Sequence, residues 1–485
     1  MDPSKIMDKI VSLAKRRGFV FQSSEIYGGL NGCWDYGPLG VEMLNNLKQH
    51  WWRTMTYRED IDGIDASILM HPRVWEASGH VENFTDPMVD CKQCKTRYRL
   101  DTLFDELSVK KKKDLLRELE PGAFEGQIKD DRVLEEFDKR LEKAEAMVRF
   151  FACPNCGNKG TFTDARKFNL MFKTFVGPVE DSSAAVFLRP ETAQGIFVNA
   201  LNVQSASRQK IPFGIAQIGK AFRNEINTKN FLFRTREFEQ MEMQFLVKPG
   251  TDDHWFDYWR SERMRWFETL GMKKEKLRWH QHAPDKLAHY AKSAYDIEYQ
   301  FPFGWGEIEG VHNRTDYDLS RHQLFSGKSL EFFDEESKEK FVPYVIETSA
   351  GASRSFMAFL VDAYQEEEAP TAEGAMETRV VLKLHPKIAP TKVAIFPLVN
   401  RDGMPELARA IESDLRPLMR VFYDESGAVG RRYRRQDEVG TPFCVTVDSQ
   451  TLQDQTVTVR HRDSMQQDRI SSSQLRAYFS EQLLQ

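Results

Sequence analysis

Long apolar segments are missing from this chain of 485 residues. No run approaches the ~20 consecutive apolar residues that a membrane-spanning helix needs. The sequence begins Met1-Asp2-Pro3-Ser4-Lys5 and lacks the apolar region of a secretory signal peptide. A transmembrane or secreted protein is therefore not expected, and we predict a cytoplasmic location.

A strong net charge is also missing. The formal charge is −5 at pH 7, so the chain as a whole has no positive excess for binding nucleic acid. Any RNA contact must therefore be local. The hydrophobic fraction of 41% over this length is enough to bury more than one core, which predicts two or three domains.

Cysteine is scarce, because the chain has six, of which Cys33 and Cys444 stand alone. The other four form two C-x-x-C pairs, Cys91 with Cys94 and Cys153 with Cys156. Two such pairs predict a zinc site, and its role would be structural because four thiolates fill the tetrahedral shell. The alternative is two reduced pairs without metal, since the loop between them is longer than in a compact zinc ribbon.

The segment between the two cysteine pairs is rich in charge. Residues 101–150 contain 25 charged side chains, with Leu134, Phe137 and Leu141 at helical spacing. This pattern predicts a helical hairpin with a solvated outer face. A plain surface insertion is a simpler reading than a catalytic role.

Alternation with a period of two runs through residues 234–245. Met241, Met243 and Phe245 fall on one face of the predicted strand. The other face carries Arg234, Arg236, Phe238, Gln240, Glu242 and Gln244. The run 213–226 ends with Arg223 and Glu225, and an antiparallel pair would bring the two polar sets together. We predict a hairpin that binds a polar, flat ligand.

Three arginine segments point to the chemistry. They are Phe222-Arg223-Asn224-Glu225, Arg234-Thr235-Arg236-Glu237-Phe238, and Gly351-Ala352-Ser353-Arg354 before an apolar helix. Arginine binds phosphate oxygens bidentately and stacks on aromatic rings. Fixed cations of this kind are required where negative charge develops as pyrophosphate leaves ATP. The segments predict an ATP site.

These segments resemble the second and third signature motifs of class II aminoacyl-tRNA synthetases. The strings 36–40 (Tyr-Gly-Pro-Leu-Gly), 188–195 (Leu-Arg-Pro-Glu-Thr-Ala-Gln-Gly), 305–310 (Trp-Gly-Glu-Ile-Glu-Gly) and 440–444 (Gly-Thr-Pro-Phe-Cys) are similar to the dimeric glycyl-tRNA synthetases within that class. The resemblance covers nearly the whole chain. It implies an α+β fold, with an antiparallel catalytic sheet flanked by helices.

The resemblance also implies a domain order. Residues 1–385 would form the catalytic domain, with residues 88–162 inserted as a zinc and helical subdomain. Residues 386–485 would form a C-terminal α/β anticodon-binding domain with a mixed sheet, because the chain changes character around Lys383-Leu384-His385-Pro386. A first-motif helix after Gly37-Pro38-Leu39-Gly40 would form the interface of a homodimer.

Site residues follow from the resemblance. Arg223, Glu225 and Arg354 would be catalytic, and Glu307 with Glu347 would hold magnesium ions on ATP. The implied ATP contacts are Arg223, Asn224, Glu225, Phe233, Arg234, Thr235, Arg236, Glu237, Phe238, Glu307, Ile308, Gly351, Ala352, Ser353 and Arg354. The implied glycine contacts are Arg99, Glu191, Phe238, Glu239, Gln240, Met241, Glu242, Glu347, Thr348, Ser349, Ala350 and Gly351.

The basic cluster Arg431-Arg432-Tyr433-Arg434-Arg435 is the densest in the chain. A solvated charge run is the simpler interpretation, but an interleaved aromatic residue and the resemblance favour contact with tRNA. The implied activity joins glycine to tRNA through glycyl-adenylate. The alternatives are a synthetase-like protein that binds nucleic acid or regulates a partner without aminoacylation, and an adenylating enzyme with another acceptor.

The inserted segment carries a hypothesis of its own. Because it is attached beside Arg99, we predict that it reaches towards the acceptor arm of tRNA. Deletion of residues 104–148 should then raise KM for tRNA and spare ATP-pyrophosphate exchange. Equal losses in both assays would refute the hypothesis.

Overall fold

The computed structural model describes residues 3–100, 103, 107–108, 110–114, 151–178, 180–284, 287–288, 290–334, 337–370 and 375–484. The predicted helical hairpin within 101–150 lies almost entirely outside these residues. Contacts divide the chain into two compact units. The first comprises Met1–Met70, Glu191–Phe222 and Thr228–Gln485, and the second comprises His71–Pro190 and Arg223–Asn227. Among the described residues, no helix has the length and apolar character to cross a membrane.

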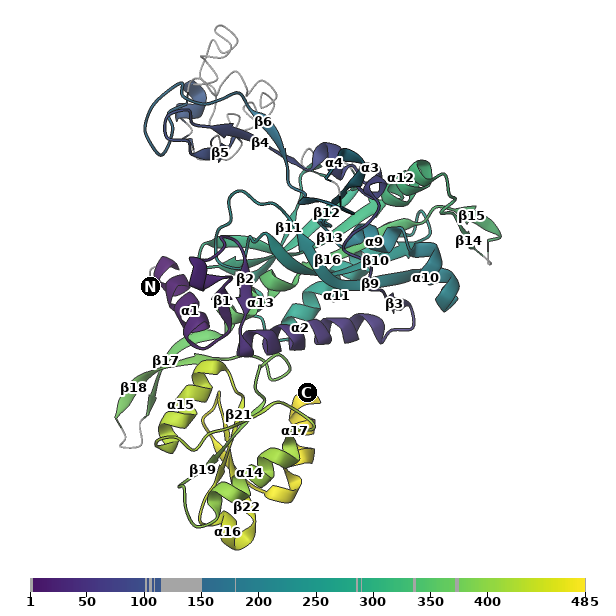
Figure 1. Cartoon of the computed structure of the whole chain (residues 1–485). Coiled ribbons are helices and arrows are strands. Elements are labelled where there is room, and N and C mark those ends of the chain that lie inside the picture. Colours follow the sequence, from purple (N-terminus) through teal and green to yellow (C-terminus); the bar gives the residue numbers. More distant parts are fainter. Residues whose placement is uncertain are drawn as a thin grey trace. The chain divides into compact units, whose positions relative to one another are not determined.

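A seven-stranded sheet forms the centre of the first unit (Figure 1). Its spatial order is β11-β12-β13-β16-β10-β9-β3. The bounds are β3 Ile61–Gly63, β9 Phe213–Phe222, β10 Glu237–Val247, β11 Leu277–Gln281, β12 Ser293–Phe301, β13 Gly304–Thr315 and β16 Tyr344–Gly351. All neighbours are antiparallel except β3 and β9, which are parallel. The predicted antiparallel sheet is therefore confirmed, with one parallel strand at its edge.

The predicted hairpin exists with shorter strands than expected. β9 ends at Phe222, which is paired with Glu237 at the start of β10. Asn230 and Phe231 in the connection have φ of 59° and 57°, so this segment turns in the left-handed region and leaves the ladder. Arg223, Glu225 and Arg234 consequently lie beyond the strand ends, on the connection and not on the strands.

Helices cover the sheet and complete its core. Their bounds are α1 Pro3–Arg16, α2 Pro38–Thr56, α9 Ala193–Phe197, α10 Ala200–Ser207, α11 Asp252–Thr269, α12 Tyr317–Ser326 and α13 Ala352–Ala363. α2, α11 and α13 contribute Trp51, Phe267 and Phe356 to one apolar cluster with Met243 of β10. In α13, which is described throughout, Arg354 is the only residue that is not buried. The partly exposed position of Arg354 sets it apart as a ligand-binding candidate.

Small two-stranded elements border this core. They are β1 Val20–Gln22 with β2 Trp34–Tyr36, β14 Phe332–Asp334 with β15 Glu339–Phe341, and β17 Tyr364–Pro370 with β18 Met376–Leu382. The turns η1 Glu25–Tyr27 and η5 Lys274–Lys276 are 3-10 helices.

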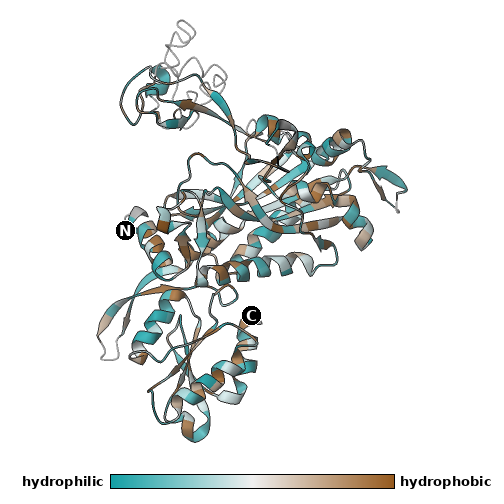
Figure 2. Ribbon diagram, in the orientation of Figure 1, coloured by the Kyte–Doolittle hydropathy of each residue, from teal (hydrophilic) through white to brown (hydrophobic). Residues whose placement is uncertain are grey.

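The C-terminal part of the first unit is a mixed sheet with helices. The strand order is β20-β19-β21-β22-β23, with β19 parallel to both β20 and β21. The strands are β19 Val393–Pro397, β20 Val421–Tyr423, β21 Phe443–Val447, β22 Thr456–His461 and β23 Gln467–Ser471. The helices are α14 Met404–Leu415, α15 Val429–Val439, α16 Thr451–Asp454, η7 Ser472–Gln474 and α17 Leu475–Leu484. Strands β19 and β21 are hydrophobic, whereas α14 has one polar and one apolar side (Figure 2). The mixed sheet with helices that was predicted for this part of the chain is confirmed.

The second unit is built from short elements. β4 Thr85–Asp90 pairs with β5 Arg97–Arg99 and β6 Arg166–Asn169, and β7 Lys173–Phe175 pairs with β8 Ala185–Phe187. Its helices are α3 Pro72–Ala77, α4 His80–Asn83 and the 3-10 helix η4 Ser182–Ala184. Both cysteine pairs belong to this unit.

Candidate active site

A row of polar side chains crosses the centre of the seven-stranded sheet. Cross-strand pairing places Gln217 opposite Glu242, Gln244 opposite Glu347, and Glu347 opposite His312. Gln217 and Gln244 are fully buried, and Glu242 is 1% exposed. Buried carboxylates are costly unless they are paired. The even-numbered side of β10 therefore lines a polar site inside the protein, as its alternation predicted.

Two carboxylates form the core of this site. The amide of Gln244 donates to both, at 3.0 Å from Glu242 Oε1 and 2.9 Å from Glu347 Oε1. The Thr192 hydroxyl donates to Glu242. Arg314 Nη1 lies 3.0 and 3.1 Å from the two oxygens of Glu347, and His312 Nδ1 lies 2.7 Å from its Oε2. Both Glu347 oxygens thus accept hydrogen bonds from the protein.

The two carboxyl groups have opposite electrostatic environments. Burial raises the pKa of Glu242 well above its usual value, and the nearby charges of Glu347 and Glu191 add to this effect. Burial would also raise the pKa of Glu347, but the Arg314 charge and the His312 hydrogen bond outweigh it and hold that pKa well below its usual value. The surroundings therefore favour the ionised form of Glu347 and the protonated form of Glu242.

Arg314 is anchored by a second acid. Its Nε and Nη2 lie 2.7 and 2.9 Å from the carboxylate of Asp318, and its guanidinium carbon lies 3.8 Å from the Tyr290 ring centroid. Gln194 Nε2 joins Asp318 to Glu191, at 3.1 and 2.8 Å respectively. This network links Glu191 to the buried pair.

Sequence analysis missed Arg314 as a member of the site. It lies 33 positions before its partner Glu347 and meets it only across the sheet. The one available signal was local, because Arg314 and Asp318 are four residues apart. That spacing is common in surface ion pairs, so it did not single out a buried one.

Arg354 lies near the exposed end of the site. Its Nε donates to the Phe233 carbonyl at 3.0 Å, and its Nη1 lies 3.0 Å from Glu307 Oε2. The guanidinium carbon is 4.5 Å from the Phe233 ring centroid. The side chain of Glu307 is 47% exposed, which leaves its carboxylate accessible to an ion from solvent.

Other predicted contacts on the hairpin have partners elsewhere. Lys48 of α2 binds Glu239 at 3.0 Å, Lys220 pairs with Glu237, and Arg236 donates to the carbonyl of Asn31. Thr235 Oγ1 donates to the Glu237 carbonyl at 3.0 Å.

The side chains of Met241, Ile308, Ala350 and Ala352 are buried in the apolar core. Only the backbone groups of these four residues could take part in the predicted ligand contacts, which stay predictions. Thr348 and Ser353 are also buried. Gln240 Nε2 reaches Ser349 Oγ at 3.2 Å, and Gly351 precedes α13. Strand alternation explains the burial of Met241, since odd positions of β10 face the core.

The second unit holds the remaining predicted catalytic residues. Arg223 Nε donates to the Pro190 carbonyl at 3.0 Å, and its guanidinium carbon lies 5.5 Å from the Phe84 ring centroid. Glu225 is 7% exposed, and the backbone N–H of Asn224 donates to the Leu170 carbonyl at 2.7 Å.

Arg99 also belongs to the second unit. Its Nη1 lies 3.1 Å from Asp86 Oδ2. Burial leaves 18% of the Arg99 side chain and 8% of the Asp86 side chain exposed. Protein contacts therefore fix the orientation of this predicted glycine contact.

The four cysteines of the two pairs converge. Their sulfur atoms all lie within 4.8 Å of one another, with 3.7 Å between Cys91 and Cys156 and 3.6 Å between Cys94 and Cys153. A tetrahedral site with Zn–S bonds of about 2.3 Å requires sulfur separations of about 3.8 Å. A hydrogen bond with Thr96 lowers the pKa of the Cys94 thiol to about 5. The donor set therefore fits zinc.

Comparisons with known proteins agree with this geometry. Residues 175–364 match the family described as the tRNA synthetase class II core domain for G, H, P, S and T, and residues 392–482 match the anticodon binding domain family. A glycine-tRNA ligase of Treponema denticola is 56% identical over 478 residues, which cover 98% of this chain and 97% of the relative. This chain belongs to the glycine-tRNA ligase family. Its relatives of that name in Thermobifida fusca and Borreliella burgdorferi are 52% and 54% identical, each covering 99% of this chain and 98% of the relative.

The basic cluster on α15 of this family member is largely structural. Arg432 is 2% exposed and donates to backbone carbonyls, including Gly427 O at 3.1 Å. The Tyr433 hydroxyl lies 2.6 Å from Thr446 Oγ1, and Arg435 Nη2 lies 2.6 Å from Asp424 Oδ2. Burial therefore removes Arg432 from contact with RNA, whereas the predicted contacts of the partly exposed Tyr433 and Arg435 stay predictions.

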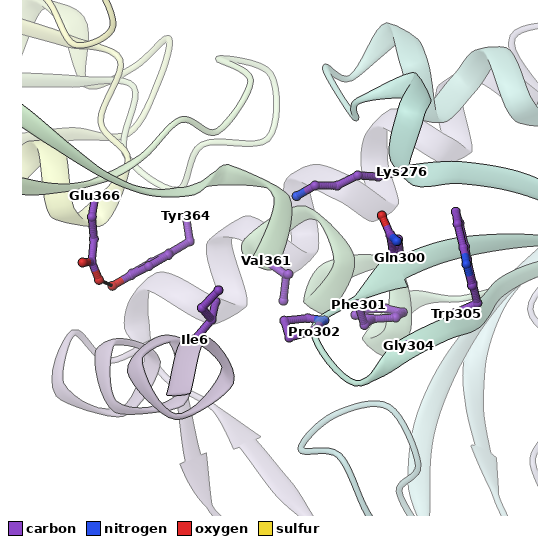
Figure 3. Close-up of a pocket in the computed structure, with 10 residues that line it drawn as sticks. All are labelled: Ile6, Lys276, Gln300, Phe301, Pro302, Gly304, Trp305, Val361, Tyr364 and Glu366. Carbon is purple, nitrogen blue, oxygen red and sulfur yellow. Dashed lines mark hydrogen bonds between the residues drawn. The ribbon is translucent and has the colours of Figure 1, made fainter. Parts of the chain in front are cut away.

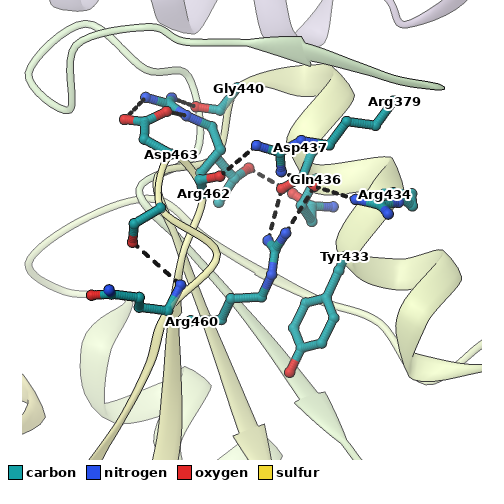
Figure 4. A network of polar contacts seen from close by, with 12 residues as sticks. Arg379, Tyr433, Arg434, Gln436, Asp437, Gly440, Arg460, Arg462 and Asp463 are labelled. Atoms are coloured by element: carbon teal, nitrogen blue, oxygen red, sulfur yellow. Dashed lines mark hydrogen bonds and ion pairs between the residues drawn. The ribbon is translucent and has the colours of Figure 1, made fainter. Parts of the chain in front are cut away.

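Two further residues of α15, Arg434 and Asp437, belong to an ion-pair network (Figure 4). Asp437 is fully buried and accepts hydrogen bonds from Arg460 at 2.8 and 3.0 Å and from Arg379 of β18 at 2.9 Å. Arg434 lies 3.7 Å from the same carboxylate and 3.1 Å from Glu377. Arg431 is the exposed member of the basic cluster and keeps its predicted role.

A separate pocket of about 510 Å³ lies beside the β12–β13 turn (Figure 3). Its charged lining residues are Lys276 and Glu366. Lys276 lies 3.4 Å from Asp362, and Glu366 binds Lys9 at 2.7 Å. Because both charges are neutralised within the protein, nothing in this pocket indicates a charged ligand.

Proposed function

We propose that this chain ligates glycine to tRNA at the expense of ATP. The buried pair Glu242 and Glu347 is the observation that carries the proposal. An α-ammonium group requires anionic partners, and a site closed around them suits the smallest amino acid. A synthetase-like binding protein without aminoacylation is the alternative, but such a protein has no need for an acid pair at the centre of its sheet.

Two displacements make up the reaction. The glycine carboxylate attacks the α-phosphorus of ATP, and the bond to the bridging oxygen breaks, so glycyl-adenylate and pyrophosphate form. A terminal ribose hydroxyl of tRNA then attacks the glycyl carbonyl, and AMP leaves. Positioning and charge stabilisation suffice for both steps, so no side-chain nucleophile is needed.

Residue roles follow from chemistry and placement. Glu191 and Glu242 would bind the ammonium group, with Ser349 nearby. Glu347, itself ionised, would keep Glu242 in position through Gln244. Arg354 would bind the adenine ring and Arg223 the α-phosphate. Magnesium bound to ATP supplies positive charge to the phosphates, and the half-exposed carboxylate of Glu307 suits it better than the fully bonded Glu347.

Aminoacylation of unfractionated tRNA tests the proposal. With ATP, magnesium and labelled glycine, the expected product is acid-precipitable glycyl-tRNA. Mild base should hydrolyse this product, and tRNA treated with periodate should not form it. The tRNA contact would involve the C-terminal domain. Failure to label tRNA, although the protein binds it in gel shifts, would favour the alternative. A cytoplasmic location is part of the same proposal.

We propose that the four cysteines bind one structural zinc ion. The two pairs have matching turns, in which the N–H groups of Lys95 and Gly157 donate to the carbonyls of Cys91 and Cys153 at 2.9 and 2.8 Å. Protein purified without chelator should contain about one zinc ion per chain, and Cys94→Ser should lose it. Substitution of the separate Cys33 by serine is the matched control. Metal-free wild type with unchanged melting temperature would contradict the proposal.

We propose that the protein is a homodimer through the region of α2. Ile26 and Tyr27 of η1 and Tyr57 directly after α2 expose 89%, 87% and 76% of their surface, so they offer apolar and aromatic side chains of the kind that subunit interfaces use. Sedimentation at micromolar concentration should give twice the chain mass. A Tyr57→Asp variant should shift towards monomer, and a wild-type monomer would overturn the proposal.

A further inference from the structure

We propose that His312 is a positioning residue for glycine, which fixes the Glu347 carboxylate through one ring nitrogen and is itself held by Asp296 through the other. This inference rests on the proposed function and extends it to a residue that contacts no substrate atom.

The arrangement crosses three neighbouring strands, β12, β13 and β16, and begins at His282, one residue after the end of β11 (Figure 1). His312 Nδ1 lies 2.7 Å from Glu347 Oε2, and its Nε2 lies 3.7 Å from Asp296 Oδ1. Asp296 in turn accepts from His282 Nε2 at 2.7 Å. A continuous line of acid and imidazole groups therefore runs from the partly exposed His282 to the buried acid pair.

The backbone of β13 makes room for this ring. Gly310 is paired with Asp296, and a Cβ atom at Gly310 would lie 2.8 Å from His312 Nε2 and 2.9 Å from its Cε1. Such a contact is too short to occur without displacement of the ring. Glycine at this position therefore permits the ring of His312 to reach both carboxylates.

The charges around Glu347 explain why His312 would be needed to position it. Glu347 is 3% exposed, so its charge needs partners within the protein. Arg314 also pairs with Asp318, and its positive charge is therefore divided between two carboxylates. His312 gives Glu347 Oε2 a donor in addition to Arg314. Together with Arg314 it orients the Glu347 carboxylate towards Gln244, and Gln244 links this orientation to Glu242.

Variants at His312 separate positioning from general stability. In glycine-dependent pyrophosphate exchange, His312→Ala should raise KM for glycine ~10- to 100-fold, because a charge-assisted hydrogen bond to a buried carboxylate is lost. KM for ATP should change less than about 2-fold, since Arg354 is untouched. His312→Asn keeps a donor at the Nδ1 position and should recover most of the glycine affinity. His254→Asn, on the exposed side of α11, is the matched control.

Gly310→Ala supplies an independent test that does not alter the imidazole. It should raise KM for glycine in the same direction as His312→Ala, with KM for ATP unchanged. Equal rises in both KM values, or unchanged glycine KM in His312→Ala, would overturn the proposal. If His312→Ala fails to fold, Gly310→Ala decides in its place, and an unchanged KM for glycine in Gly310→Ala would overturn the proposal. Wild-type protein that exchanges with no amino acid would instead refute the proposed function itself.

Discussion

Replacement of Arg354 by alanine is expected to lower kcat/KM for ATP in pyrophosphate exchange by ~10³-fold, as for other arginines that stabilise phosphoryl-transfer charge. Arg354 is the one residue of α13 that is not buried, and Glu307 and Phe233 orient its guanidinium. Arg354→Lys keeps the charge but loses the planar stacking surface, so an intermediate loss is expected.

Stability should change little in the Arg354 variants, because a half-exposed ion pair contributes only ~0–1 kcal/mol. Arg476→Ala, which removes a surface ion pair with Asp414 in the C-terminal domain, is the control for removal of an exposed arginine. A loss of less than about 3-fold in Arg354→Ala, measured with folded protein, would show that Arg354 has no part in binding ATP.

Replacement of Glu242 by glutamine is expected to raise KM for glycine ~100-fold with little change in KM for ATP, since one partner of a buried charge pair is removed. The amide keeps the shape of the side chain and can still bond to Thr192 and Gln244. The expected loss is therefore electrostatic. Glu368→Gln on the exposed β17–β18 hairpin is the matched control.

The same group predicts a pH dependence. Burial, with the charges of Glu347 and Glu191, raises the pKa of Glu242, so the protonated form dominates below that pKa. Binding of an ammonium group favours the carboxylate and releases the proton. KM for glycine should therefore rise as pH falls through the pKa of Glu242, and this dependence should be absent in Glu242→Gln. Parallel pH profiles for the two proteins would contradict the assignment.

The polar face of β10 could be predicted because strand alternation is local. Glu242 and Gln244 fall on it two residues apart, and Met241 falls on the opposite face. The ends of the strands could not be predicted, since Asn230 and Phe231 adopt left-handed backbone that ordinary residues seldom take. Arg223 and Arg234 were consequently placed on strands although they lie on the connection.

Long-range pairing explains the other differences. Arg432 looked like an RNA-binding residue because charge runs are usually solvated, and only the folded chain brings backbone carbonyls such as Pro397 O to its guanidinium. Asp437 likewise acquires Arg379 from 58 residues away. The sequence shows which residue types could form such networks, but it does not show which residues pair with one another.

ATP-pyrophosphate exchange without tRNA, screened against all twenty amino acids, tests the central claim most directly. The account predicts exchange with glycine alone, greatly reduced in Arg354→Ala and in Glu242→Gln at glycine concentrations near the wild-type KM. Exchange with a larger amino acid, or none with any amino acid by folded protein, would contradict it.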